Sequence, residues 1–329
     1  MPGIRNDNGQ ARFISPRKPI HASVSQLIEA NGLFKDFKTV RALDDVSLKV
    51  RRGEIFGFFG PNGAGKTTCI RVLCGLTKAN LGEADVLGID VVRHPVHVRD
   101  NVAILSEETR FYEEMTPRRY LNMFGKFMLM SRVERMRGID LATGLADLKS
   151  FIDRRISQLS QGQRQRVALA RVLMSDVPLM FLDEPFEGID IMHRKRLREY
   201  LREYVSKGNT VFFTSHNLIE AEHIVDRFAF INKGKITAVG TADELKEKYL
   251  LPAFTLHVSD PQRAMGIIDD GMKVQNIKLV DGNVFVILRK RADAAQASRL
   301  LVQAGIDLFE IKTAGTMEDV FERTARGDA

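Results

Sequence analysis

The alternation of apolar and polar residues divides the chain into a large first region and a smaller one after Pro252. An alternating stretch that starts at Gln26 and runs to Val50 predicts two antiparallel strands. Apolar runs at 178–182 and 210–214 predict strands that are buried on both faces. Strands that alternate with helices in this way indicate an α/β fold, in which a largely parallel sheet carries helices on both faces.

The stretch 108–157 lacks strand signals and has apolar residues at helical spacing, which predicts a helical insert within the α/β region. The residues that set this spacing are Leu121, Met123, Phe124, Phe127, Met128, Leu145 and Leu148. Two interpretations of the face rich in Met and Phe remain open. It is either ordinary core or an adaptable docking surface, a role that suits flexible methionine side chains.

The region after Pro252 predicts a small α+β module of ferredoxin-like order. Its expected elements are strand 254–258, helix 261–269, strand 273–280, strand 284–289, helix 292–303 and strand 307–311. A final helix starts at Thr316, where 316–319 resembles a capping box.

Three segments follow from this pattern. Residues 1–25 are rich in Gly, Pro, Asn, Ser and Arg without a period, and we expect them to form a flexible tail. We expect the main domain to span 26–250 and the accessory domain to span 253–329.

A glycine-rich loop between the predicted strand 54–59 and a predicted helix fits the phosphate-binding pattern G-x-x-x-x-G-K-[ST]. It consists of Gly60, Pro61, Asn62, Gly63, Ala64, Gly65, Lys66, Thr67 and Thr68. Glycines let backbone N–H groups converge on one point at a helix N-terminus, which makes a site for a polyphosphate. Lys66 can reach the β- and γ-phosphates, and the Thr67 hydroxyl can join a Mg²⁺ shell. The alternative is a glycine-rich turn that binds nothing.

Polar residues follow two other predicted strands and suit phosphate chemistry. Asp183, at the end of strand 179–182, can hold Mg²⁺ directly or through water. Glu184 can polarise a water aimed at the γ-phosphate, and His216 can donate a hydrogen bond to a γ-phosphate oxygen. The alternatives are a pair of exposed carboxylates and a structural histidine.

Ser160, Gly162 and Gln163 begin another predicted helix and form a second anion site. Because this helix start is separate from the phosphate loop, it suits the nucleotide of a facing subunit better than its own. Phe37 precedes the loop by about the length of a hairpin. It either stacks on an adenine ring or packs in the core.

Over about residues 27–250 these motifs resemble the ATP-binding subunit of an ABC transporter. The resemblance identifies 60–68 as Walker A, 159–163 as the signature, 179–183 as Walker B and 186–190 as the D-loop. It assigns the adenine platform to Phe37, the switch histidine to His216 and the catalytic carboxylate to Glu184. It also implies ATP and Mg²⁺ as cofactors, and two subunits that sandwich two ATP molecules.

The sequence departs from the family pattern at three places. Glu107 stands where the family usually has a Mg²⁺-sensing Gln, and either residue offers an oxygen ligand. Gln161 replaces a signature glycine, and Phe186-Glu187 replaces the small residue common in the D-loop. None of these removes a catalytic atom, so they bear on turnover rate more than on activity itself.

The net charge of +7 leaves three interpretations open: nucleic-acid binding, attraction to an anionic membrane and an ordinary solvated surface. No nucleic-acid module is visible, so we expect no nucleic-acid partner. No stretch approaches the ~18 apolar residues of a membrane helix, and the N-terminus lacks a signal-peptide pattern. We therefore expect a cytoplasmic protein, held at the inner face of the cell membrane by a separate transmembrane permease.

The expected function is that of an ATP-hydrolysing subunit that powers an exporter through closure of a dimer, and we expect a homodimer. The segment 316–322 resembles the C-terminal extension of subunits that export drugs, lipids or polysaccharides. The alternative is a soluble ABC-type ATPase acting on ribosomes or nucleic acid. However, such proteins usually carry two cassettes or very long coiled coils, and this chain has neither. A regulatory sensor without turnover would be expected to lack Glu184.

Overall fold

The structure, a computed structural model, describes residues 25–106 and 109–326. Its centre is a sheet of order β10-β9-β3-β8-β7-β6, parallel except for the β9–β10 hairpin. The strands are β3 (Ile55–Phe59), β6 (Val102–Leu105), β7 (Leu179–Asp183), β8 (Thr210–Ser215), β9 (Arg227–Asn232) and β10 (Lys235–Gly240). Strands β3, β7 and β8 are buried along their whole length, as their continuous apolar sequences predicted.

A second, antiparallel sheet of order β2-β1-β4-β5 covers one side of the central sheet. It contains β1 (Gln26–Phe37), β2 (Val40–Arg51), β4 (Leu81–Val86) and β5 (Ile89–Asp90), with α1 (Lys66–Leu73) and α2 (Pro95–Asp100) alongside. Buried residues of this sheet, α1 and the central sheet form one apolar core. Within it the rings of Phe56 and Phe212 stack with centroids 5.6 Å apart.

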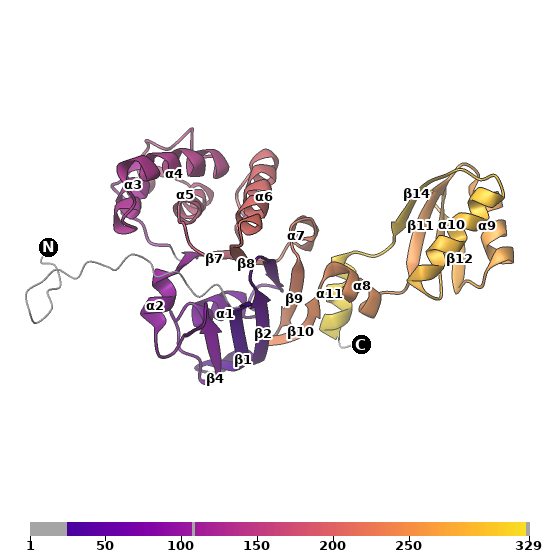
Figure 1. Cartoon of the computed structure of the whole chain (residues 1–329), viewed down its shortest axis with the longest axis horizontal. Helices are drawn as coiled ribbons and strands as arrows, with labels where there is room; N and C mark the ends of the chain where they lie inside the picture. The colour runs from indigo at the N-terminus through magenta and orange to yellow at the C-terminus, as the bar shows by residue number, and fades with distance from the viewer. Residues whose placement is uncertain (1–24, 107–108, 327–329) are drawn as a thin grey trace, which may run out of the picture.

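Helices cover the other side of the central sheet (Figure 1). They are α3 (Pro117–Phe127), α4 (Arg132–Leu145), the short η1 (Ile156–Gln158), α5 (Gln161–Leu173), α6 (Ile191–Ser206) and α7 (Leu218–Glu222). In the described part of the predicted insert, 109–157, the regular elements are all helical. Thr116 caps α3, and a capping box of Ser131 and Glu134 starts α4. Among the described residues, every helix is too short or too polar to span a lipid bilayer.

The C-terminal module has the predicted ferredoxin-like order, and it stands to one side of the rest (Figure 1). Its elements are β11 (Ala253–Val258), α9 (Pro261–Gly271), β12 (Asn276–Val280), β13 (Asn283–Ile287), η2 (Arg291–Asp293), α10 (Ala294–Gln303) and β14 (Leu308–Thr313). All neighbours in the sheet order β12-β13-β11-β14 are antiparallel. The module has its own apolar core, which includes Leu256, Val284 and Leu301.

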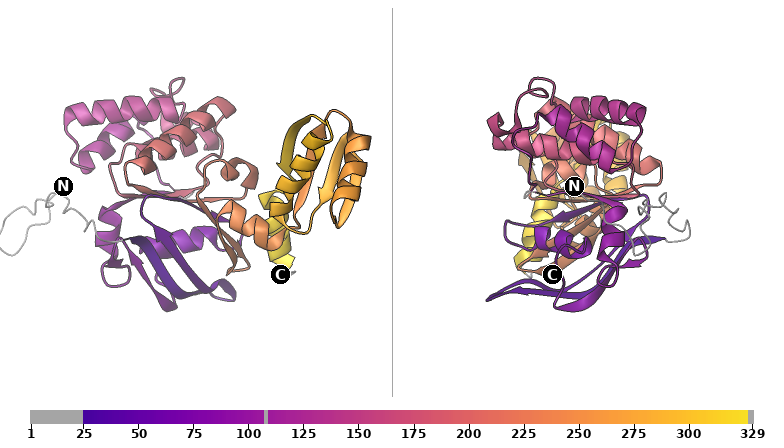
Figure 2. Two further views of the ribbon diagram at one scale, coloured as in Figure 1. Left: turned by 45° about the vertical axis from the view of Figure 1, so that its right-hand side comes forward. Right: turned by 90° about the vertical axis from the view of Figure 1, so that its left-hand side faces the viewer.

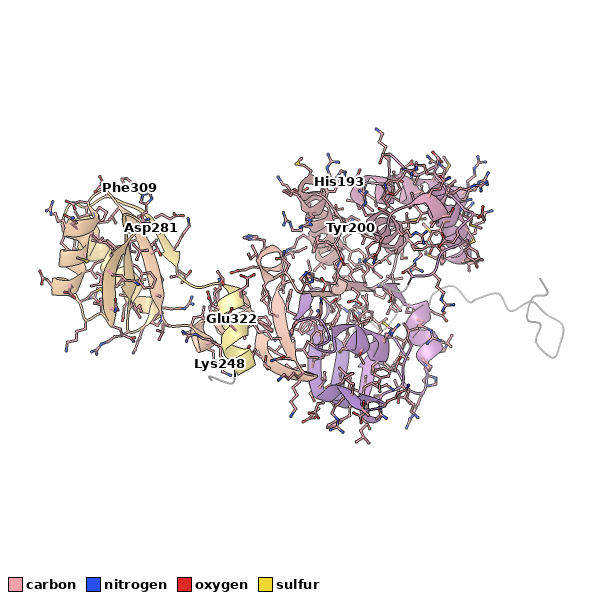
Figure 3. The ribbon with its side chains drawn as sticks, turned by 180° about the vertical axis from the view of Figure 1, so that it is seen from behind. His193, Tyr200, Lys248, Asp281, Phe309 and Glu322 are labelled. Carbon is pink, nitrogen blue, oxygen red and sulfur yellow. The ribbon has the colours of Figure 1, made fainter. Side chains whose placement is uncertain are left out.

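The last helix, α11 (Met317–Arg326), belongs to the main domain, which differs from the expected accessory domain of 253–329. Met317 and Val320 are buried in the main core, and the Phe321 ring packs on Phe230 with centroids 5.4 Å apart. The helix lies beside α8 (Ala242–Tyr249), as Figure 2 shows. Lys248 of α8 and Glu322 of α11 mark the two helices in Figure 3. The apolar face of α11 therefore fills part of the main core. Residues 1–24 of the expected tail lie outside the described residues.

Candidate active site

The phosphate loop joins β3 to α1, and close contacts explain two of its glycines. A Cβ at Gly60 would lie 2.2 Å from the Ile231 carbonyl oxygen, and one at Gly65 would lie 2.4 Å from that of Ala42. Gly65 also has φ +112°, outside the range that other residues readily adopt. No side chain caps α1 at Gly65, so the N–H groups of its first turn can serve an anion.

Lys66 lies almost fully buried at the start of α1. Its ammonium donates to the Gly60 carbonyl oxygen at 2.8 Å and to that of Pro61 at 3.4 Å. The same Nζ lies 3.6 Å from Oε1 of Glu184. The ammonium is therefore held inside the loop that would surround the phosphates.

Asp183 is buried at the C-terminal end of β7, where it accepts two hydroxyl hydrogen bonds. Thr67 Oγ1 donates to its Oδ2 at 2.8 Å, and Thr214 Oγ1 donates to its Oδ1 at 2.5 Å. Burial raises the pKa of Asp183 above its ordinary value, and the bonds from Thr214 and Thr67 oppose this rise. Carboxylate and hydroxyl oxygens suit Mg²⁺, so this donor set fits the ion.

Glu184 follows in a left-handed backbone conformation, with φ +49°. This conformation costs about 1–2 kcal/mol for a residue other than glycine, and such strain is often found at functional sites. The Glu184 side chain is nearly buried, and its Oε1 lies 3.1 Å from Nδ1 of His216. Lys66 thus approaches this carboxylate from the start of α1, and His216 approaches it from the residue after β8.

The signature residues start α5 at a separate place. Ser160 Oγ accepts from the N–H of Gln163, while Gln163 Oε1 accepts from that of Ser160. Among the described residues, the hydrogen bonds of Ser160 and Gln163 stay within this helix start. Gly162 lies against Gly188 of the D-loop. The predicted anion site is therefore a capped helix start.

Phe37 and Glu107 are the two remaining residues predicted for the site, and the structure describes only Phe37. The Phe37 side chain is 45% exposed, and the Lys35 ammonium lies 4.9 Å from its ring centroid. This exposure argues against core packing and leaves the ring free to stack on a base. Glu107, the predicted Mg²⁺ ligand, lies outside the described residues.

Sequence reasoning missed Thr214, the second donor to Asp183. Parallel pairing of β7 with β8 puts Asp183 directly beside Thr214. The sequence did contain a signal, because the next predicted strand, 210–214, ends in the hydroxyl residue Thr214. Recognising it required the register of the two strands.

Comparison with known proteins identifies the family. The model of the ABC transporter family matches residues 43–187. The chain is 38% identical over 220 residues to the daunorubicin resistance ATP-binding protein DrrA3 of Streptomyces coeruleorubidus, covering 67% of this chain and 69% of that protein. The chain belongs to the ABC transporter ATP-binding family.

Other members of the family extend the likeness. The Nod factor export ATP-binding protein I of Rhizobium sp. (strain N33) is 32% identical over 90% of this chain and 96% of its own length. A solved structure described as the ATP-binding subunit of an ABC transporter has a TM-score of 0.63 at 28% identity. It covers 68% of this chain and 93% of its own.

The family resemblance and the fold class expected from the sequence are confirmed. This ABC protein is an ATP-binding, ATP-hydrolysing cassette, with a ferredoxin-like module added between α8 and α11.

Proposed function

We propose that this ABC cassette is the motor subunit of a membrane exporter, in which two copies close around ATP and reopen after hydrolysis. Support for export comes from relatives that are named for daunorubicin resistance and Nod factor export. Support for hydrolysis comes from the position of Glu184 between Lys66 and His216. This grouping of a carboxylate with two potential cations is the observation on which the proposal rests.

Each site residue has a separate proposed role in binding or hydrolysing ATP. Lys66 binds the β- and γ-phosphates together with the loop N–H groups. Thr67 and Asp183 would hold Mg²⁺, which neutralises part of the phosphate charge. Glu184 accepts a proton from the attacking water, and His216 donates to a γ-phosphate oxygen and steadies Glu184. Phe37 stacks on the adenine ring at the exposed end of β1.

Exposed apolar side chains beside the site support the second subunit. Ile191 and Met192, directly after the D-loop, are 80% and 65% exposed, and Ile219, close after His216, is 60% exposed. Large apolar side chains that stay exposed next to functional segments favour burial by a partner. We propose that the partner is a second copy, whose Ser160, Gly162 and Gln163 complete the nucleotide site.

The helical insert supplies a surface for the permease. Phe111, Met115, Met123, Phe124 and Met130 pack against the core, which is the first of the two interpretations of this apolar face. Other apolar side chains of the insert are exposed, namely Tyr112, Phe127, Leu129, Val133 and Met136. We propose that a separate transmembrane chain docks here and holds the cassette at the cytoplasmic face of the membrane. The net charge of +7 would favour an anionic surface.

The test is Glu184→Gln, measured by analytical ultracentrifugation and phosphate release with Mg²⁺ and ATP. Loss of the general base should stop hydrolysis while ATP still binds, so a stable dimer should accumulate. Glu199→Gln, at an exposed carboxylate of α6 outside the site motifs, is the matched control and should behave as the natural chain. Normal phosphate release by the Glu184 variant would refute the assigned base. A monomer at saturating ATP, even with the permease present, would refute the sandwich.

A further inference from the structure

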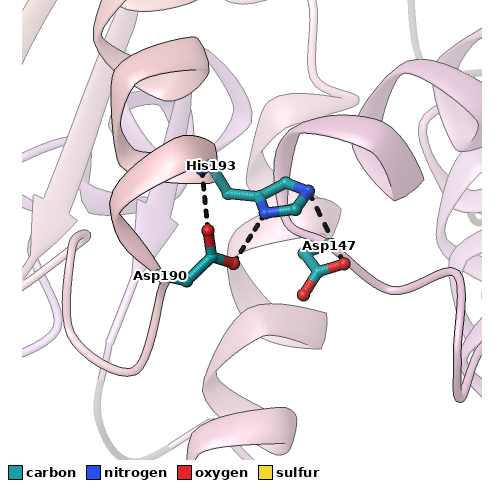
Figure 4. A group of neighbouring side chains, drawn as sticks. All are labelled: Asp147, Asp190 and His193. Carbon is teal, nitrogen blue, oxygen red and sulfur yellow. Dashed lines mark hydrogen bonds and ion pairs between the residues drawn. The ribbon is translucent and has the colours of Figure 1, made fainter.

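Three side chains join the D-loop to the helical insert (Figure 4). Asp190 caps α6, and its Oδ1 accepts from the N–H groups of Met192 and His193. Its Oδ2 lies 2.6 Å from Nδ1 of His193. The other ring nitrogen, Nε2, lies 3.5 Å from Oδ1 of Asp147, just beyond the end of α4. One imidazole thus lies between a D-loop carboxylate and an insert carboxylate.

Arg166 explains the charge balance of this cluster. Its Nη1 donates to Oδ2 of Asp147 at 2.5 Å and to the Asp147 carbonyl oxygen at 3.2 Å. Its guanidinium also lies 4.9 Å from the ring centroid of Phe151. Two carboxylates and an imidazole resemble a metal-binding set. However, the Arg166 cation already neutralises Asp147 and would repel a metal ion, so the cluster is a salt-bridge network.

The D-loop touches the insert side at a second point. Gly188 has φ +69°, and a Cβ there would lie 3.3 Å from the Cα of Gly162 at the start of α5. Phe186 and Ile189 are buried and anchor the loop in the main core. At its start, the N–H of Glu187 donates to the Glu184 carbonyl oxygen at 3.2 Å. The loop that begins at the strained Glu184 therefore ends at Asp190.

We propose that His193 is a positioning residue, which ties the D-loop to the helical insert through Asp147 and so helps to set the position of Glu184. This inference rests on the proposed function. A displacement of the insert moves Asp147, and the bridge passes that movement to Asp190. Because few residues separate Asp190 from Glu184 and a tight turn joins them, the movement reaches the base. A permease docked on the insert would thereby change the rate of hydrolysis.

The test distinguishes the contact of His193 with Asp147, here called the bridge, from the contacts of His193 with Asp190 at the start of α6. In His193→Gln, the amide can still close a capping box, as Gln163 does on α5, but it cannot span both carboxylates. We expect kcat for ATP to fall about tenfold, the effect of one charge-assisted contact, with the KM for ATP unchanged. Asp147→Asn should give a similar loss. The double variant should lose no more than either single one, because both changes break one bridge.

Two further variants complete the design. His193→Arg introduces a guanidinium that can donate to both carboxylates, and it should restore most of the rate. Lys195→Gln, at an exposed position of α6, is the control and should change nothing. The bridge is refuted if His193→Gln keeps its full rate, or if the double variant loses the product of the single losses. Normal hydrolysis by Glu184→Gln would instead refute the proposed function, so the two failures can be told apart.

Discussion

Thr214→Val tests how the buried Asp183 is stabilised. The exchange keeps the shape of the side chain and removes the hydroxyl that donates to Oδ1 of Asp183. Because Asp183 is 1% exposed, water cannot replace the lost bond. A hydrogen bond to a charged group contributes about 1.5–3 kcal/mol, and one to a neutral group about 0.5–1.5 kcal/mol. The cost should therefore be about 2 kcal/mol when Asp183 is ionised and about 1 kcal/mol when it is protonated.

The sign of the pH dependence follows from the pKa of Asp183. Burial raises its folded-state pKa, so Asp183 contributes stability below its unfolded pKa and loses it as pH rises through the folded value. Loss of the Thr214 bond raises the folded pKa further. The variant should therefore be most destabilised at neutral pH. The difference in free energy of unfolding between the variant and the natural chain should shrink as the pH falls.

Urea denaturation at a series of pH values, from neutral to acid, follows the free energy of unfolding as Asp183 gains its proton. Thr210→Val is the matched control, since Thr210 is equally buried on β8. Within the described part of the chain, its hydroxyl accepts from the Gly53 N–H and donates to the Arg51 carbonyl oxygen. Its cost should not depend on pH. An equal pH dependence for the two variants would show that Asp183 does not need the Thr214 hydroxyl.

Two further substitutions test the loop and the last helix. Gly65→Ala should abolish ATP binding in calorimetry, because its Cβ would meet the Ala42 carbonyl oxygen and its φ of +112° is strained for alanine. Gly53→Ala, also at positive φ but in open space, should keep ATP affinity, and equal losses would contradict the steric argument. Val320→Ala should lower the free energy of unfolding by about 2 kcal/mol, because a fully buried side chain leaves a cavity in the main core. The exposed Glu318→Ala should change it by less than about 0.5 kcal/mol, and equal effects would place α11 outside the core.

Local sequence signals predicted most of the fold. The loop 60–68 carries its glycine pattern within one short stretch, and Asn232-Lys233-Gly234 marks the β9–β10 turn directly. The strand and helix order after Pro252 was sufficient to predict the ferredoxin-like module. Each of these depends on residues that are neighbours in the chain.

Contacts between distant segments could not be predicted in the same way. The bond from Thr214 to Asp183 depends on strand register, and the approach of His193 to Asp147 depends on how α4 and α6 pack. The capping box at Thr316 predicted where α11 begins but not which core it joins. The roles of Ser160, Gly162 and Gln163 in a facing site stay a prediction, as does the stacking role of Phe37.

The return of α11 has a consequence for the architecture of the chain. The C-terminal module leaves the cassette after α8 and rejoins it before α11, and the N–H of Ala314 donates to the Ala253 carbonyl oxygen at 2.8 Å. Entry and exit therefore run side by side, so the module is an insertion that two adjacent connecting segments join to the cassette. A stop codon ahead of it would also strip Met317 and Val320 from the cassette. Removing the module alone requires an internal deletion that joins the segment after α8 to the segment before α11.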